Sequence, residues 1–138
     1  MSSNPKHIGP GYWANWHSIS LYTDTREKKS ELARNILLAV DKFPCREPCR
    51  KDSIKYIKSN PLLPAVDSKD PLSLFKWTVN FHNYVNNKLK KTIFTWVEAK
   101  EAWSGNGGIC FENCGVSEEE IDREEEEEKE IEIVIKSY

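Results

Sequence analysis

The sequence lacks several features that would assign a protein to a class at once. Six glycines and seven prolines in 138 residues are too few for a fibrous or collagen-like chain. No apolar run approaches the roughly 20 residues that a bilayer-spanning helix requires. The opening MSSNPKHIGPGYW has no charged segment followed by an apolar one, as a secretory signal would. We therefore expect a protein of the cytosol or nucleus without a membrane span, unconventional export being the alternative.

Patterns for common electron carriers and nucleotide loops are also missing. The chain contains no ligand pattern for haem or an iron–sulfur cluster, and no glycine-rich phosphate loop of the dinucleotide-binding kind. Acidic and basic side chains nearly balance, 22 against 20, for a net charge of −2. The overall charge therefore points to no class of partner. The length is that of about one domain.

The charges are distributed unevenly along the chain. Residues 118–138 hold 3 basic and 11 acidic side chains, a net charge of −8, whereas residues 1–117 hold 17 and 11, a net charge of +6. Residues 118–138 are highly charged and have few large apolar side chains to bury in a core. The predicted organisation is an N-terminal arm over 1–8, a folded domain over 9–103, a flexible segment over 104–115 and a disordered acidic tail over 116–138.

Apolar residues recur at spacings of three and four rather than two, which predicts an all-α fold. Asp24 and Glu27 form a capping-box pattern at one helix start. Asp70 and Pro71 provide a cap and a first-turn residue at another. Residues 61–70 show no clear period and are predicted to be a linker. The five predicted helices cover residues 10–23, 25–42, 48–60, 71–89 and 95–103.

The predicted helices carry apolar stripes with polar residues beside them. His17 and Ser20 lie on the stripe of the first helix, and His82 and Asn86 share a strip beside that of the fourth. Buried polar groups of this kind need hydrogen-bond partners. The apolar stripes of the second and fourth helices are Leu32, Ile36, Leu37 and Val40, and Leu74, Trp77, Phe81, Val85 and Leu89.

Four cysteines form two close pairs, Cys45 with Cys49 and Cys110 with Cys114. The first pair flanks a predicted helix start among cations, a setting that lowers the pKa of a thiol and favours the reactive thiolate. In a cytosolic chain such pairs favour redox chemistry or metal binding over structural bridges. Small buried side chains or an all-thiolate zinc site are the alternatives, although zinc pairs usually have two intervening residues and these have three.

Three segments together resemble the FAD-linked sulfhydryl oxidases of the Erv/ALR family. The most specific is His-Asn-x-Val-Asn-x-x-Leu-x-Lys, which begins at His82. The resemblance covers about residues 9–103. Within the family, the chain looks most similar to the members encoded by large DNA viruses. The three segments are GPGYWANWH at 9–17, FPCREPCRKDSIKYIKSNPL at 43–62 and WTVNFHNYVNNKLKK at 77–91.

The resemblance implies a four-helix bundle with a short fifth helix, which binds FAD at one end and forms a homodimer. It implies that Cys49 lies next to the flavin and that Cys45 exchanges with substrate. Cys110 and Cys114, after a Ser-Gly-Asn-Gly-Gly hinge, are a candidate shuttle pair. No metal ligands are implied. The implied cofactor-binding residues are Gly9, Trp13, His17, His82, Asn83, Val85, Asn86, Lys88, Lys91, Trp96 and Trp103.

The implied activity is formation of disulfide bonds in substrate proteins. Electrons would pass through Cys45 and Cys49 to FAD and then to dioxygen, which gives hydrogen peroxide. The expected partners are thiol-containing proteins or a small redox carrier, and not nucleic acid. The expected location is the host cytoplasm or the virion, with the mitochondrial intermembrane space second. The alternative is a non-catalytic helical interaction module that uses its cysteines for zinc or packing and recruits a basic partner through its acidic tail.

Two positions depart from the family pattern. The family's Cys-x-x-Cys is lengthened by one residue between Cys45 and Cys49. A disulfide needs a Cα separation of about 4.4 to 6.8 Å, so we expect closure to be easiest if Cys45 stands outside the helix, where Pro44 and Pro48 favour non-helical backbone. Trp16 stands where leucine is common, and the site must accommodate the larger side chain.

Overall fold

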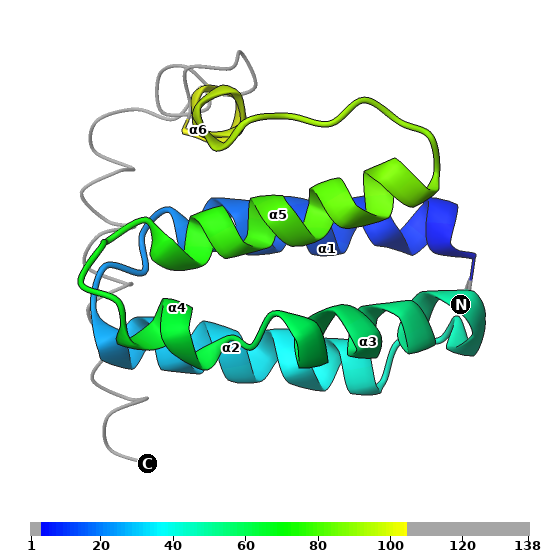
Figure 1. Ribbon diagram of the computed structural model, residues 1–138, viewed down its shortest axis with the longest axis horizontal. Helices are drawn as coiled ribbons and strands as arrows, with labels where there is room; N and C mark the ends of the chain where they lie inside the picture. The colour runs from blue at the N-terminus through cyan, green and yellow to red at the C-terminus, as the bar shows by residue number, and fades with distance from the viewer. Residues whose placement is uncertain (1–3, 105–138) are drawn as a thin grey trace, which may run out of the picture. The chain divides into compact units, whose positions relative to one another are not determined.

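A computed structural model describes residues 4–104 of the chain (Figure 1). The chain divides into two units, residues 1–104 and 105–138. Cys110, Cys114 and the acidic tail, for which a shuttle role and disorder are predicted, lie outside the described residues. The fold and the site are therefore those of the first unit.

Within residues 4–104 the regular structure is helical and contains no strand. The prediction of an all-α fold is confirmed. No helix in this part of the chain has the length and apolar character needed to traverse a bilayer. The elements in chain order are α1 (Pro5–Ser20), α2 (Arg26–Asp41), η1 (Arg46–Arg50), α3 (Lys51–Ser59), α4 (Leu63–Asp67), α5 (Ser73–Lys88) and α6 (Trp96–Trp103).

The long helices form a bundle of two layers (Figure 1). Helices α1 and α5 pack together in one layer, and α2 lies with α3 and the short α4 in the other. Successive long helices run in alternating directions, and α6 crosses the outer side of α5 and is seen nearly end-on. This up-and-down arrangement is typical of amphipathic helices joined by short connections.

The core lies between the two layers and follows most of the predicted stripes. Ile36 and Leu74 are fully buried and Phe81 is 1% exposed. The predicted burial of Leu37 is wrong: its side chain is 46% exposed, because it lies about 100° around α2 from Ile36. The predicted burial of Leu89 is also wrong: its side chain is 59% exposed, because α5 ends before it. The main core cluster is Trp16, Leu32, Ala33, Ile36, Val40, Leu62, Val66, Leu74, Trp77 and Phe81.

Helix α1 begins five residues before its predicted start, so the described part of the predicted arm is largely helical. Asn4 is the N-cap, and its side-chain oxygen accepts a hydrogen bond from the Lys6 amide at 3.0 Å. Pro5 occupies the first turn, where its missing N–H is not needed. Pro10, the predicted first-turn residue, lies inside the helix. The Asn-Pro pair at residues 4 and 5 was the stronger start signal.

Two other predicted starts are displaced. The capping box at Asp24 is wrong, because Thr25 is the N-cap of α2 and its hydroxyl accepts from the Lys28 amide at 3.2 Å. Helix α5 begins at Ser73 rather than Pro71. The Asp70 carboxylate accepts from the Leu72 amide at 2.9 Å, which shapes a turn before the helix.

The predicted linker over 61–70 contains α4, one short turn of helix that packs into the core. Leu62 and Val66 are 6% and 4% exposed. They are four residues apart and share one side of the turn. A five-residue helix shows too little of its period to be recognised in the sequence.

Candidate functional site

Cys45 and Cys49 form a disulfide in the connection between α2 and α3. Their Cα atoms are 5.5 Å apart. The backbone at Cys45 (φ −77°, ψ 98°) and at Glu47 (φ −131°, ψ 133°) is extended. The prediction that Cys45 stands outside the helix is therefore confirmed. Both cysteines are partly exposed, so a thiol substrate can approach the bond.

Contacts with α1 and within the connection fix the disulfide at one end of the bundle. The guanidinium of Arg50 donates to the Phe43 carbonyl through Nε at 3.2 Å and Nη2 at 2.9 Å. The Phe43 ring packs edge-on against Tyr12 of α1, with ring centroids 5.4 Å apart. Because Phe43 is two residues before Cys45, these contacts place the disulfide near the N-terminal half of α1.

A cluster of aromatic rings joins α1, α5 and α6. Trp13 stacks on His82 with centroids 4.3 Å apart and planes 5° apart. His17 lies 5.9 Å from the Trp13 ring and 5.0 Å from that of His82. Trp103 approaches His17 at 5.4 Å. The structure thus brings together four of the predicted cofactor-binding residues.

A chain of hydrogen bonds fixes the tautomers of the two histidines. Thr78 Oγ1 donates to the Phe75 carbonyl at 2.7 Å, so it accepts from the His17 Nδ1–H, which is 3.0 Å away. His17 Nε2 is then the acceptor for the His82 Nδ1–H at 2.8 Å. The lone pair of His82 Nε2 makes no hydrogen bond within the described part of the chain. It can accept one from a ligand.

Burial keeps both histidines neutral. Desolvation, with a smaller contribution from the neighbouring His82, lowers the pKa of His17 to about 3. Desolvation and then the Lys91 cation lower the pKa of His82 to about 4. Near pH 7 the pair therefore carries no charge, and each imidazole has one donor and one acceptor nitrogen.

The C-terminal end of α5 brings cations and an amide to the same region. Lys90 has a positive φ of 56°, and the amides of Lys90 and Lys91 donate to the carbonyls of Asn87 and Asn86 at 3.2 and 2.8 Å. These are the bonds of a Schellman motif. The turn leaves the Lys91 side chain close enough to affect His82.

Two further predicted residues at this end are Asn86 and Lys88. Asn86 is 6% exposed, and its side-chain amide makes no hydrogen bond within residues 4–104. No fully buried side-chain nitrogen or oxygen in that range lacks a partner, so the Asn86 amide keeps access to the surface. Lys88 pairs with Asp52 at 3.0 Å and lies 4.8 Å from the centre of the Tyr84 ring.

Asn83, another predicted cofactor residue, makes two hydrogen bonds to the backbone of Phe94. Its Oδ1 accepts from the Phe94 amide at 3.0 Å and its Nδ2 donates to the Phe94 carbonyl at 2.5 Å. Both polar groups of the amide therefore hold the connection between α5 and α6. This fixes where α6 begins.

The other predicted cofactor residues lie outside the ring cluster. Trp96 is 40% exposed, and Lys76 Nζ lies 4.3 Å from the centre of its ring. Val85 is partly buried against the main core. Gly9 lies on α1, and apart from its own local backbone and chain neighbours no atom lies within 4 Å of the position that a Cβ would take.

The ring cluster and the C-terminal end of α5 fit a ligand with flat rings and phosphates. Trp13 and His82 offer ring faces, and Lys91 offers a cation suited to phosphate. Exposed apolar residues continue from the end of α5 along the connection to α6, where Trp96 lies over Lys76 in the first turn of α5. They are Leu89, Ile93, Phe94, Trp96 and Val97, between 40% and 59% exposed.

Comparison with known proteins assigns this arrangement to a family. The model of the Erv1 / Alr family matches residues 10–104. The chain belongs to this family. The predicted resemblance is therefore confirmed.

Relatives in the Erv1/Alr family include a viral and a yeast protein. An "FAD-linked sulfhydryl oxidase" of African swine fever virus (isolate Warthog/Namibia/Wart80/1980) is 32% identical over 100 residues, 70% of this chain and 80% of the relative. The "Mitochondrial FAD-linked sulfhydryl oxidase ERV1" of Saccharomyces cerevisiae is 32% identical over 92 residues, 64% of this chain and 46% of the relative. The crystal structure of the FAD binding domain of Erv1 from Saccharomyces cerevisiae matches with a TM-score of 0.61 and 28% identity, over 74% of this chain and 94% of that one.

The structure also shows how this Erv1/Alr member accommodates Trp16. The side chain is 4% exposed and its ring centroid is 5.4 Å from those of Tyr12 and Trp13. Its Nε1 donates to Asn35 Oδ1 at 3.3 Å. The larger ring is absorbed in the core, and its polar atom has a partner on α2.

Sequence reasoning missed Thr78, which anchors the histidine pair. A signal was present, since Thr78 precedes His82 by four residues and so lies on the same face of α5. Its hydroxyl, however, also bonds the carbonyl three residues before it. Only the structure shows that it faces His17 on another helix.

Proposed function

We propose that the chain is an FAD-linked sulfhydryl oxidase that forms disulfide bonds in proteins, with Cys45 and Cys49 as its redox pair. The observation that carries this proposal is the disulfide between these two residues in a chain that belongs to the Erv1/Alr family. A bonded pair argues against zinc as the role of these two thiols, because zinc binds thiolates. Among residues 4–104 no group of three or more His, Cys, Asp or Glu side chains is placed to hold a metal ion.

The reaction begins with thiol–disulfide exchange. A substrate thiolate attacks Cys45 Sγ, a mixed disulfide forms, and Cys49 leaves as a thiolate. The second substrate thiolate then attacks the substrate sulfur of the mixed disulfide and releases Cys45. The substrate loses two electrons and two protons, and the enzyme pair gains two electrons. The guanidinium of Arg50, held by Phe43, and the Arg46 cation next to Cys45 stabilise the thiolates.

The residues described above would bind FAD at the end of the bundle. The Trp13 and His82 rings and the side chain of Trp103 offer stacking surfaces, and Lys91 and Asn86 offer a cation and an amide for the phosphates and the ribose. FAD supplies the acceptor for two electrons from the Cys49 thiolate. Dioxygen is the final acceptor and takes up two electrons and two protons to give hydrogen peroxide.

Two tests address the cofactor and the cysteines. The purified protein should be yellow, with a flavin absorption band. A colourless preparation with one zinc ion per chain would contradict the oxidase and favour the non-catalytic interaction module. The Cys49→Ser variant should keep FAD and lose at least about a thousandfold in turnover, because it lacks the thiol that leaves in the first step. Oxygen consumption at the original rate with a small dithiol would refute the assignment.

Cys110 and Cys114 are proposed as a shuttle between protein substrates and Cys45. The support is their position after the Ser-Gly-Asn-Gly-Gly segment, since a tethered thiol pair has a local concentration toward the millimolar range. The double variant Cys110→Ser/Cys114→Ser should lose activity toward a reduced protein and keep it toward a small dithiol. Equal retention of both activities would assign the pair a structural role.

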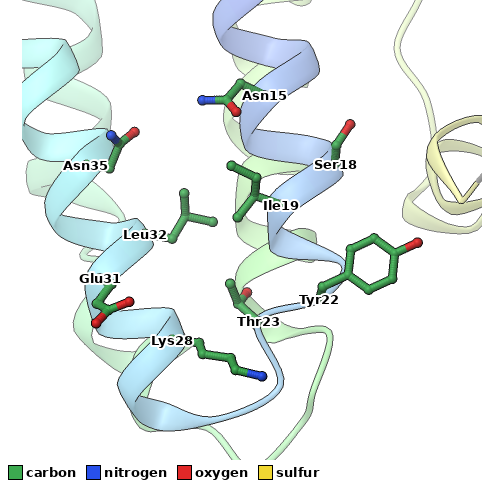
Figure 2. A pocket seen from close by; sticks show the side chains of 9 residues that line it. All are labelled: Asn15, Ser18, Ile19, Tyr22, Thr23, Lys28, Glu31, Leu32 and Asn35. Carbon is green, nitrogen blue, oxygen red and sulfur yellow. The ribbon is translucent and has the colours of Figure 1, made fainter. Parts of the chain in front are cut away.

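The proposed assembly is a homodimer through the outer face of α1 and α2. A groove of about 580 Å³ runs between these helices, and Figure 2 shows Ile19 and Leu32 pointing into it. Two apolar side chains that line the groove are exposed, Ile19 at 44% and Tyr22 at 71%. One turn beyond the groove on α2, Leu38 is 61% exposed. Exposed apolar side chains near such a groove favour association.

The dimer is tested with two leucines of equal exposure. Leu38→Glu should convert the protein to a monomer in sedimentation equilibrium, because it introduces a charge into the apolar contact. Leu63→Glu, on α4 and also 61% exposed, should not. A monomeric parent protein, or the same mass for both variants, would contradict the assigned face.

The proposed location follows the relatives. The viral relatives support the cytoplasm of an infected cell or the virion. The mitochondrial relative supports a mitochondrial location as the second choice, for which we propose the intermembrane space. The proposed partners are thiol-containing proteins or a small redox carrier.

A further inference from the structure

Three lysines on α3 form a row that begins beside the disulfide. Lys51, Lys55 and Lys58 are exposed and occupy positions i, i+4 and i+7, which lie on one face of a helix. Lys51 follows Cys49 by two residues. At about 1.5 Å per residue the row extends roughly 10 Å along the helix. Arg46, between the two cysteines, is also exposed.

Few carboxylates offset these charges. Glu47 lies 3.6 Å from Lys51, and both side chains are at least 75% exposed, so the pair contributes little. Within residues 4–104, Arg46, Lys55 and Lys58 form no ion pair. The carboxylate of Asp52, the only acidic residue of α3, is held by Lys88 of α5.

The stability of α3 accounts for Lys58, a cation in the last turn, but not for the two lysines before it. Like charges at i and i+4 destabilise an isolated helix by about 0.2 to 0.5 kcal/mol per pair, and Lys51 and Lys55 have this spacing. The three lysines are exposed. They place a positive field next to the bond that a substrate thiolate must reach.

We propose that the row of Lys51, Lys55 and Lys58, together with the nearby Arg46 cation, is a docking surface for acidic segments of protein substrates. It rests on the proposed function, because it concerns which thiols reach the Cys45–Cys49 disulfide. An extended peptide rises about 3.3 Å per residue, so a row of roughly 10 Å spans three to four residues. The preferred substrates carry acidic side chains within about five positions of the cysteine that exchanges.

Exposed charges of this kind act mainly on the rate of encounter. Charge of one sign raises the rate at which an oppositely charged partner arrives, by about 10- to 1,000-fold where it lines a cleft, and salt reduces the effect. At an ionic strength of about 0.1 M the Debye length is near 10 Å, similar to the length of the row. The effect should appear in kcat/KM at low salt and disappear at high salt.

The test uses the full-length protein with FAD and three peptides that carry the same pair of cysteines. The flanking residues are glutamate, glutamine or lysine, and a small neutral dithiol is the reference. Loss of flavin absorbance without oxygen gives the rate of reduction. The glutamate peptide should react at least about tenfold faster than the lysine peptide at low salt, and the ratio should approach one at about 0.5 M salt. Equal rates for the three peptides would overturn the proposal.

Two charge-reversal variants locate the effect. Lys55→Glu/Lys58→Glu should abolish or invert the preference for the glutamate peptide. Arg34→Glu/Lys69→Glu makes the same change in net charge at exposed positions of α2 and the α4–α5 connection and should keep the preference. Both should reduce flavin with the neutral dithiol at the parent rate. Equal effects of the two variants on the peptides would overturn the assignment to α3.

Other occupants of the row give different results. Two competitors of equal charge are compared, a single-stranded oligonucleotide and an acidic peptide without thiols. If the oligonucleotide inhibits flavin reduction by the glutamate peptide more strongly, the proposal that the row binds proteins would be overturned. A preference that appears only after removal of residues 118–138 would assign the row to the chain's own acidic tail. Absence of reaction with the neutral dithiol would refute the proposed function itself.

Discussion

At the scale of single residues, Thr78 connects the backbone of α5 to the ring cluster. Its hydroxyl donates to Phe75 and accepts from His17, so the proton on His82 is placed on Nδ1. His82 Nε2, an acceptor without a hydrogen bond to any residue in 4–104, is thereby set for a donor group of a ligand. A threonine that touches no ligand thus controls the hydrogen-bonding pattern that the ligand meets.

We predict that Thr78→Val weakens FAD binding and changes the tautomers, whereas Thr78→Ser preserves both. Valine cannot accept from His17 Nδ1–H, and a buried donor without a partner costs about 1 to 3 kcal/mol. Nitrogen NMR of the two imidazoles measures the tautomers, and titration of the apoprotein measures the FAD dissociation constant. Unchanged ring-nitrogen shifts and affinity in the valine variant would show that Thr78 has no such role.

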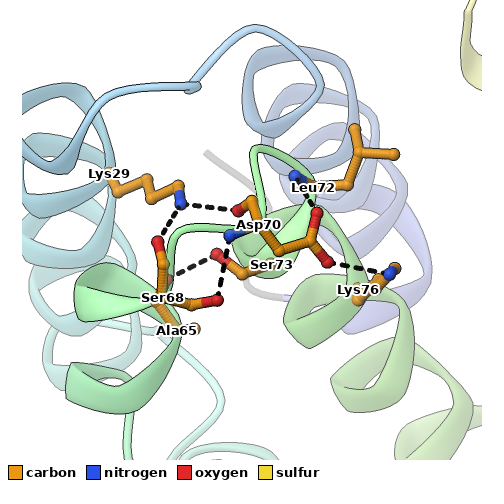
Figure 3. A network of polar contacts seen from close by, with 7 residues as sticks. All are labelled: Lys29, Ala65, Ser68, Asp70, Leu72, Ser73 and Lys76. Carbon is orange, nitrogen blue, oxygen red and sulfur yellow. Dashed lines mark hydrogen bonds and ion pairs between the residues drawn. The ribbon is translucent and has the colours of Figure 1, made fainter.

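At the scale of elements, a buried lysine joins α2 to the connection between α4 and α5. Lys29 is 1% exposed, and its ammonium group donates to the carbonyls of Ser68 and Asp70 at 2.8 and 2.7 Å. Figure 3 shows this network from close by. The Lys76 ammonium, 2.8 Å from the Asp70 carboxylate, holds the pKa of that carboxyl below its usual range, with the Leu72 amide.

We predict that Lys29→Met lowers the free energy of unfolding by about 2 kcal/mol or more, because it leaves two carbonyl groups without their donor. Lys28→Met is the matched control. Its side chain is 55% exposed in a pair with Asp24, and its loss should change stability by no more than about 0.5 kcal/mol. Urea unfolding of both variants measures the difference. Equal midpoints would mean that water replaces the ammonium group of Lys29.

At the scale of the whole molecule, the two histidines connect stability to pH. In the unfolded chain both imidazoles bind protons as the pH falls through about 6.5. In the folded protein they do so only near pH 3 for His17 and pH 4 for His82. The unfolded state therefore binds more protons over this interval, and stability decreases as the pH falls.

We predict that the urea midpoint of the protein falls between pH 7 and pH 5, and that His82→Gln reduces this dependence. Glutamine has polar atoms but does not titrate. The measurement is the urea midpoint of each protein at both pH values and at fixed FAD concentration, since a bound ligand adds stability. The same slope in parent and variant would exclude His82 as a source.

The sequence alone determined the helical class and the family, and it predicted Cys45 and Cys49 as the redox pair. The three-to-four spacing of Ile36 and Val40 on α2, and of Trp77 and Phe81 on α5, required burial on one face of each helix. Cys45 and Cys49 are separated by only three residues, and the local backbone, non-helical at Glu47, brings their Cα atoms to 5.5 Å. The non-helical backbone near Cys45 is also a local property, because Pro44 and Pro48 favour it.

Only the tertiary structure decided the partners of residues far apart in sequence. Lys29 lies at a position of the apolar stripe of α2, three residues before Leu32, yet its acceptors are carbonyls 39 and 41 residues away. The contact between His17 and His82 spans 65 residues, and a helical period gives the face but not the facing helix. Asn83, predicted to bind the cofactor, holds the backbone of Phe94. Hydrogen bonds act over about 3 Å, so they depend on how the helices pack.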